Sequence, residues 1–262
     1  MTDLPSPAQA PGDPFGTLTG PLAGTVRMKL EVVESGLVTP HMQRVVLTAP
    51  ELADFEYLPG QDVMLLVDVE GGRPVRRRYT IRAVDGGRQL LTLDVVRHSD
   101  GPGERWIRAA APGVTIEGIG PRGKISPAPH TDWHLFIGDD SSLAAIFAMT
   151  ESLPPDTTAT VILEVPEPAD AQELRPHAPV QLTWLYRRGR PAGQPQALAS
   201  AASAVAIAAS RPHAYLLGEA RVVLALRQVL QERGLEPAQI SPKSYWGRGK
   251  ANASHGEPAK DG

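Results

Sequence analysis

The sequence predicts two domains of different class, an antiparallel six-stranded β-barrel followed by an α/β domain built on a parallel sheet. Three observations support this prediction. The chain has 262 residues, which is long enough for two domains of ordinary size. Between residues 24 and 128, short alternating segments follow one another, separated by turns that contain glycine or proline. From residue 129 to residue 250, strand-like and helix-like segments alternate instead.

The first domain is expected to contain six strands that close into a small barrel. Most of these segments alternate hydrophobic and polar residues, and Asp85-Gly86-Gly87 is a strong turn signal between two of them. The expected strands cover residues 26–34, 42–48, 63–69, 76–82, 90–96 and 114–119. Strands at this spacing, with Val, Leu and Ile filling the interior, are typical of an antiparallel barrel.

The second domain is expected to be a parallel sheet with helices on both faces. A linker that contains two prolines, at residues 126–131, separates it from the barrel. Its expected strands cover residues 133–137, 159–165, 180–186, 214–217 and 240–246. Its expected helices cover residues 141–152, 169–174, 196–209 and 220–234. The two ends, residues 1–23 and 251–262, lack periodicity and are expected to form a flexible arm and a mobile tail.

The composition excludes several classes of function. The chain has no cysteine, which excludes disulfides, Cys-ligated zinc and iron–sulfur clusters, so any electron transfer must rest on a bound organic cofactor. The net charge of −3 argues against a nucleic-acid partner held by bulk charge. No segment has the apolar length of a membrane span, and no secretory signal is visible. We therefore expect a cytoplasmic protein without a membrane partner.

Residues 76–82, RRRYTIR, form the most informative segment. Side chains alternate between the two faces of a strand, so Arg77, Tyr79 and Ile81 should share one face. The other face should carry three arginines and a threonine, namely Arg76, Arg78, Thr80 and Arg82. Arginine forks, an aromatic ring and a short hydroxyl suit a ligand that is anionic at one end and flat at the other. On residue types alone, a solvated and positively charged strand edge is the better interpretation.

The order of the residues changes that interpretation. Arg-x-Tyr-Thr, at Arg77, Tyr79 and Thr80, resembles the flavin-binding strand of the ferredoxin-reductase superfamily. With the later segments in the same order, the chain after about residue 24 resembles the siderophore-interacting protein family, which are flavin-dependent ferric-siderophore reductases. The resemblance implies that FAD lies between barrel and sheet. Its pyrophosphate would contact Arg77, Tyr79 would stack on the isoalloxazine, and Thr80 would hydrogen-bond near N5.

A glycine-rich turn lies between the last two barrel strands. Gly101-Pro102-Gly103 can bring backbone N–H groups close to an anion, and a short helix expected from Glu104 onward would add its N-terminus. A compatible alternative is an ordinary turn into a helix whose Trp106 plugs the barrel. The resemblance implies that this segment holds the pyrophosphate and adenylate side of FAD, and it assigns four residues to that role: His98, Gly101, Gly103 and Trp106.

The first strand-to-helix turn of the second domain is GDDSSL, residues 138–143. It lacks the glycines of a phosphate-cradling turn, and its two aspartates would oppose a pyrophosphate unless they are paired. The resemblance nevertheless places this turn near the flavin and the electron donor, which assigns Gly138, Asp139 and Ser141 to the cofactor site. A Gly-Glu-Ala turn at 218–220 also resembles a turn of the family. Helix caps that merely end strands are an equally good interpretation of the acidic residues.

The last expected strand ends in Tyr245-Trp246, and two basic residues follow it. This segment resembles the terminal Tyr-Trp-Arg of the family, although Gly247 stands where the family has arginine. The resemblance places the segment beside the flavin. Arg248 and Lys250, with an arginine from the outer face of the RRRYTIR strand, are therefore candidates for contacting an anionic ferric siderophore. On charge alone, a solvated tail is the better interpretation of these two residues.

These observations predict an FAD-dependent reductase that releases iron(II) from ferric siderophores, with NAD(P)H or reduced ferredoxin as electron donor. Because the turn at 138–143 lacks a glycine-rich cradle, nicotinamide binding should be weak or replaced by ferredoxin. We expect a monomer that needs no acid–base residue and does not itself ligate iron. Two alternatives stay open: another flavin or ferredoxin reductase of the same architecture, and a siderophore-binding protein that has lost the cofactor.

Overall fold

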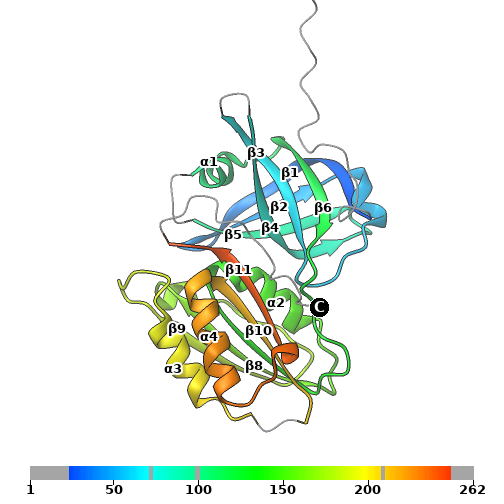
Figure 1. The fold of residues 1–262 in the computed structure, drawn as a ribbon. Coiled ribbons are helices and arrows are strands. Elements are labelled where there is room, and N and C mark those ends of the chain that lie inside the picture. The colour runs from blue at the N-terminus through cyan, green and yellow to red at the C-terminus, as the bar shows by residue number, and fades with distance from the viewer. Residues whose placement is uncertain (1–23, 71–72, 98–100, 208–209, 249–262) are drawn as a thin grey trace, which may run out of the picture.

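A computed structural model describes residues 24–70, 73–97, 101–207 and 210–248. A barrel and a sheet domain lie side by side, as the sequence predicts (Figure 1). Two predicted site residues, His98 and Lys250, lie outside the described residues, as do the expected arm at 1–23 and tail at 251–262. In the described part of the chain, no helix combines the length and the hydropathy that crossing a membrane requires.

Six antiparallel strands close the first domain into a barrel, in the order β1-β2-β5-β4-β3-β6. They are β1 (Val26–Thr39), β2 (Met42–Thr48), β3 (Asp62–Glu70), β4 (Arg73–Asp85), β5 (Leu90–Val96) and β6 (Thr115–Arg122). The prediction of a six-stranded barrel is confirmed. Strand β1 is longer than predicted because its second half forms a hairpin with β2, in which Thr39 pairs with Met42.

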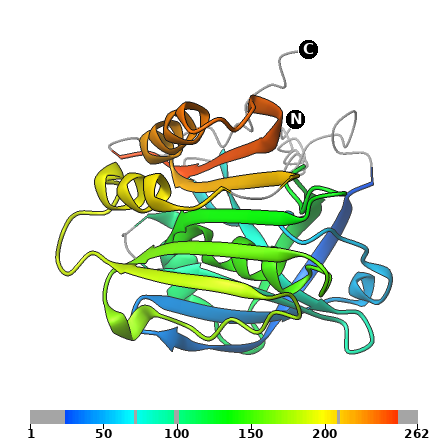
Figure 2. The same ribbon diagram turned by 90° about the horizontal axis from the view of Figure 1, so that it is seen from below.

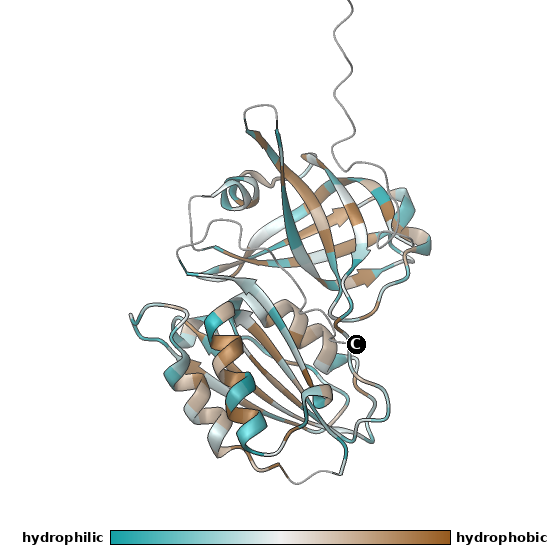
Figure 3. Cartoon of the chain, in the orientation of Figure 1, coloured by the Kyte–Doolittle hydropathy of each residue, from teal (hydrophilic) through white to brown (hydrophobic). Residues whose placement is uncertain are grey.

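Alternation along the strands builds the barrel interior. In β1, Met28, Leu30 and Val32 are at most 1% exposed, whereas Lys29 and Glu31 between them are exposed. The short helix α1 (Pro102–Ala109) adds Trp106 and Ile107 to the same core. The interpretation of this helix as a plug of the barrel is therefore confirmed. Figure 3 shows hydrophobic residues along the strands of both domains.

Five parallel strands form the sheet of the second domain, in the order β11-β10-β7-β8-β9. They are β7 (Trp133–Asp139), β8 (Thr158–Val165), β9 (Val180–Tyr186), β10 (Pro212–Glu219) and β11 (Ile240–Trp246). The α-helices are α2 (Leu143–Glu151), α3 (Pro195–Ala204) and α4 (Ala220–Glu232). Helix α2 lies on the sheet face that is turned toward the barrel, and α3 and α4 cover the other face (Figures 1 and 2). Helices on both faces are thus confirmed.

All four predicted helices are shorter than expected, and those predicted at 169–174 and 196–209 differ most. The segment at 169–174 contributes only a 3₁₀ turn, η4 (Pro168–Asp170), after which the backbone of Ala171 is extended. The carboxylate of Asp170 accepts hydrogen bonds from the backbone N–H groups of Glu167 and of His41 in the barrel. The helix predicted at 196–209 ends at Ala204. The backbone of Val205 is extended there, which is a conformation that β-branched residues favour.

Helix α2 has almost no polar face. All residues from Leu143 to Thr150 are buried, because the helix lies between the sheet and the barrel strands β4 and β5. This helix therefore fixes the outer side of β4 against the second domain.

Candidate functional site

Strand β4 divides its side chains between two environments. On its inner side, Ile81 is fully buried in the barrel core, and Tyr79 packs against that core. Arg77 lies on the same side, against the start of α1. On its outer side, Thr80 donates a hydrogen bond of 3.3 Å to the Tyr245 hydroxyl of β11. The predicted division of faces is confirmed.

Helix α1 begins directly against Arg77 and Tyr79. A Cβ atom on Gly103 would lie 2.8 Å from the Tyr79 hydroxyl and 3.5 Å from Cγ of Arg77, so a side chain here would push the tyrosine away. Gly101 is the N-cap residue, and no side chain caps the helix there. Packing against Tyr79 therefore favours glycine at 103. The start of the helix keeps backbone N–H groups that can bind an anionic ligand.

Trp106 adds a second aromatic ring and a donor. Its ring centroid lies 5.3 Å from that of Tyr79, with the two planes tilted by 38°. Its indole N–H is buried and finds no acceptor among the described residues. Burial raises the pKa of Tyr79 well above its ordinary value, which keeps the phenol neutral. Buried donors are normally hydrogen-bonded, so an acceptor atom of a ligand would satisfy Trp106.

Ion pairs occupy the outer side of β4. Arg78 forms a bidentate pair with Asp62 of β3, at 2.8 and 2.6 Å. Arg82 binds Glu151 at the end of α2, at 2.7 and 2.9 Å. Both guanidinium groups thus bind carboxylates of the protein. The expectation that an outer arginine contacts the substrate therefore has no support from Arg78 or Arg82.

The turn after β7 is acidic and buried. Asp139 accepts hydrogen bonds from the backbone N–H and the hydroxyl of Ser141 at one oxygen. Its other oxygen accepts from the N–H of Glu219 at 3.1 Å and from the indole N–H of Trp246 at 3.0 Å. Burial and the neighbouring Asp140 raise the pKa of Asp139 to about 7, and these hydrogen bonds oppose the rise. The carboxylate thus caps the turn, which was one of the two interpretations.

Gly138 is required by packing at the end of β7. A Cβ atom there would lie 2.7 Å from the carbonyl oxygen of Leu217 and 3.0 Å from Cδ1 of Ile146. Strand β10 and helix α2 therefore approach the backbone too closely for a side chain. Glycine at this position lets β10 and α2 pack closely against the end of β7. Its assignment to the cofactor site stays a prediction.

The acidic residue at the end of β10 acts in a similar way. One oxygen of Glu219 accepts from the N–H of Arg221 at 2.6 Å and caps α4. The other accepts from the N–H of Arg248 at 3.1 Å. A Cβ atom on Gly193 would lie 2.9–3.1 Å from Glu219, Arg248 and Trp246. The two acidic turns and this glycine loop therefore hold the segment after β11, from which the side chain of Arg248 is exposed.

Two family models match the chain. One is described as siderophore-interacting protein and matches residues 131–249, and the other is the siderophore-interacting FAD-binding domain and matches residues 66–125. An uncharacterized protein of Mycobacterium tuberculosis is 32% identical over 87% of this chain and 93% of its own length. The chain belongs to the siderophore-interacting protein family.

Solved and curated relatives agree with this assignment. The siderophore-interacting protein described here is 29% identical to the ferric vibriobactin reductase ViuB of Vibrio cholerae, over 87% of this chain and 92% of ViuB. A crystal structure of a siderophore utilization protein from T. fusca is 30% identical, with a TM-score of 0.80, and covers 88% of this chain and 96% of that one. The Amycolatopsis cytochrome P450 reductase GcoB, 20% identical with a TM-score of 0.69 over 85% of this chain and 70% of its own, shares the fold. The protein is a flavin oxidoreductase with a ferredoxin-reductase-like fold.

The described residues of the barrel side fit FAD. Arg77 supplies a cation, the start of α1 supplies backbone N–H groups, and Trp106 supplies an indole N–H without an acceptor in the described part of the chain. All three lie within the segment that matches the FAD-binding domain of the siderophore-interacting protein family. Phosphate oxygens are acceptors that such donors bind well.

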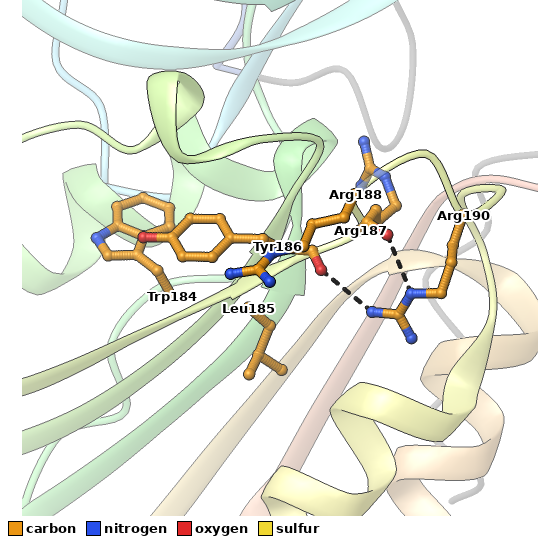
Figure 4. A pocket seen from close by; sticks show the side chains of 6 residues that line it. All are labelled: Trp184, Leu185, Tyr186, Arg187, Arg188 and Arg190. Atoms are coloured by element: carbon orange, nitrogen blue, oxygen red, sulfur yellow. Dashed lines mark hydrogen bonds between the residues drawn. The ribbon is translucent and has the colours of Figure 1, made fainter.

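A cavity of about 460 Å³ lies at the carboxyl end of β9 (Figure 4). It is lined by aromatic, aliphatic and cationic side chains, namely Trp184, Leu185, Tyr186, Arg187, Arg188 and Arg190. Arg187 is buried and pairs with Asp140 at 2.5 Å, whereas Arg190 donates to the backbone carbonyls of Arg187 and Tyr186. This cavity is absent from the predictions made from the sequence. The run Arg-Arg-Gly-Arg directly after a predicted strand was the signal that could have indicated it.

Proposed function

We propose that this protein reduces ferric siderophores with FAD bound between the barrel and the sheet domain. One observation carries the proposal. On β4, Arg77 and Tyr79 lie against the open start of α1, while the adjacent Thr80 contacts Tyr245 of the other domain. A single strand therefore presents a cation and a ring to one side and a hydroxyl to the domain interface, as a ligand with a phosphate end and a flat polar ring requires.

Each residue of this strand has a role in the proposal. Arg77 and the start of α1 would bind the pyrophosphate, Tyr79 would pack against the isoalloxazine, and Thr80 would hydrogen-bond near N5. When bound, FAD accepts electrons in pairs and passes them on singly, which suits the reduction of iron(III). The protein would orient the cofactor and shield it from water, and it would not itself ligate the iron, which arrives bound to the siderophore.

The substrate assignment rests on the segment after β11 and on the relatives. Arg248 is exposed, and its backbone is held by Glu219, so its side chain is free to turn toward a ligand from a fixed position. Together with Lys250 it would attract an anionic ferric siderophore. The names of the relatives support a ferric substrate, since they include the ferric vibriobactin reductase and an NADPH-dependent ferric-chelate reductase of Escherichia coli, 26% identical over 68% of each chain.

The electron donor in this proposal is NAD(P)H or reduced ferredoxin. Asp139 and Glu219 occupy the ends of β7 and β10, where a parallel sheet of this topology usually binds a dinucleotide. Glu219, and Asp139 once it is ionised, oppose a pyrophosphate, which favours weak nicotinamide binding or a protein donor. The expectation of a cytoplasmic monomer stays a prediction.

The direct test combines cofactor and substrate. The purified protein should be yellow, release FAD rather than FMN on denaturation, and produce iron(II), trapped by a ferrous chelator, from a ferric siderophore and a reductant. A colourless protein that binds the ferric siderophore would favour a carrier. Activity on ferredoxin or free flavin, with none on ferric chelates, would favour another reductase of the same fold.

A further inference from the structure

A buried ion network crosses the domain interface beside Thr80. The ammonium of Lys243 on β11 lies 3.3 Å from Oδ2 of Asp62 on β3. Both residues are almost completely buried, with exposed fractions of 3% and 2%. Both oxygens of Asp62 already accept hydrogen bonds from the guanidinium of Arg78 on β4. The network therefore joins strands β3 and β4 of the barrel to β11 of the sheet domain. Both β4 and β11 border the proposed flavin site.

This network carries more positive than negative charge. Two cations, Arg78 and Lys243, share the single carboxylate of Asp62. A third cation, Arg122 of β6, stands opposite Asp62 in the strand register. Burial, and next the nearby Arg78, lower the pKa of Arg122 below its ordinary value, as expected where cations crowd together. A buried cation such as Lys243 favours the binding of an anion beside it.

The network lies next to Thr80, the residue that is assigned to the flavin ring. A cavity of about 30 Å³, enough for about one water molecule, opens onto the three members of the network. The same cavity is lined by Thr80 and by Tyr245, whose ring centre lies 5.2 Å from the Lys243 ammonium. No second carboxylate is among the residues that line it.

We infer that Lys243, with Asp62 and Arg78, sets the reduction potential of the bound flavin by favouring its reduced, anionic form. The inference rests on the proposed binding of FAD at this interface. FAD that takes up two electrons and one proton gains one negative charge relative to oxidised FAD. The positive charge of the buried Lys243 ammonium stabilises that form, because the interaction is weakly screened in a buried site. Lys243 is thus assigned to tuning the cofactor, and its effect is separate from substrate binding.

The test is a spectroscopic redox titration of the purified, FAD-loaded protein. Lys243→Gln removes the charge but keeps an N–H donor for Asp62. It should make flavin reduction about tenfold less favourable, which lowers the midpoint potential by about 30 mV. Lys243→Arg should keep the wild-type potential. Asp62→Asn removes the anion of the network and should raise the potential. Lys29→Gln, on the exposed side of β1, is the matched control and should change nothing.

If the network tunes the flavin, Lys243→Gln and Asp62→Asn should shift the midpoint potential in opposite directions. A merely structural role would destabilise both variants and would not produce opposite shifts of the potential. Thermal unfolding of each protein, measured in parallel, reports the structural part. If Asp62→Asn does not fold, the two Lys243 variants still decide the matter. An unchanged potential in Lys243→Gln overturns the inference while the proposed function stands. A wild-type protein that binds no FAD overturns both.

Discussion

Helix α1 of the barrel and the turns at the ends of β7 and β10 in the sheet domain begin in opposite ways. In the barrel domain, α1 starts at Gly101 without a side-chain cap, and Arg77 lies beside its first turn. In the sheet domain, Glu219 caps α4, and Asp139 caps the 3₁₀ turn that leads into α2. At any helix start the first N–H groups have no partner within the helix, so they attract either a carboxylate of the protein or an anionic ligand.

The difference indicates which of these regions is better suited to phosphate. The start of α1 leaves N–H groups and a cation for a ligand, whereas carboxylates of the protein occupy the corresponding positions at the ends of β7 and β10. The order of the strands in the sheet is that of nucleotide-binding domains, but its acidic turns hold the segment after β11 instead. A shared fold therefore does not carry the shared ligand site with it.

The largest effect should come from the acidic side of this comparison. Asp139 has a pKa of about 7 in the folded protein, above the ordinary value of 3.8, so the folded state holds a proton that the unfolded chain has lost between these pH values. The free energy of unfolding should therefore fall as pH rises through that window, by up to about 1.4 kcal/mol per pH unit. Asp139→Asn should flatten this dependence, which urea unfolding at several pH values would measure.

Glu51→Gln is the control for this experiment, because Glu51 is exposed and lies away from the acidic turns. It should keep the wild-type dependence on pH. An Asp139→Asn protein with the same slope as the wild type would show that this carboxyl is ionised throughout the window.

On the basic side of the comparison, Arg77→Ala should lower the affinity for FAD. Losing a charge-assisted hydrogen bond to phosphate costs roughly 1.5–3 kcal/mol, which corresponds to about a tenfold to hundredfold increase in Kd. Titration of the apoprotein with FAD would measure it. Arg88→Ala is the matched control, since Arg88 is exposed after the Asp85 turn. Equal titrations of the two variants would remove Arg77 from the site.

We expect the acidic turns at the ends of β7 and β10 to weaken the binding of NADPH and NADH. Anaerobic stopped-flow reduction of the flavin should be slow or unsaturated with NADPH and NADH, and faster with reduced ferredoxin, because Asp139 and Glu219 oppose a pyrophosphate. Fast reduction that saturates at micromolar NADPH would contradict this interpretation of the sheet domain.

The smallest effect should come from the exposed cations after β11. Single exposed contacts contribute about 0.2–1 kcal/mol each, so Arg248→Ala combined with Lys250→Ala should raise KM for a strongly anionic ferric tris-catecholate by only a few fold. Flavin content and the rate of flavin reduction by the donor should not change. Added salt should weaken the wild type more than the double variant. Unchanged KM and salt dependence would make these two residues a solvated tail.

Local patterns in the sequence predict much of this molecule because they depend on near neighbours. The faces of β4 follow from a period of two, and β2, β5, β9 and β11 begin and end at the predicted residues. The helix predicted at 169–174 is wrong, and the local pattern does not reveal the distant contact of this segment. Asp170 accepts a hydrogen bond from the backbone N–H of His41, which lies 129 residues away in the chain.

The candidate site also contains features that local sequence predicts and features that it does not predict. Arg77, Tyr79 and Thr80 are recognisable in the sequence because they stand within four residues on one strand, and the acidic and glycine turns are equally local. Only the tertiary structure shows that Gly103 makes room for Tyr79, that Asp139 binds Trp246, and that Lys243 meets Asp62 across 181 residues. Such contacts depend on how distant parts of the chain pack against each other. The hydrophobic periodicity of one domain cannot predict where the other domain lies.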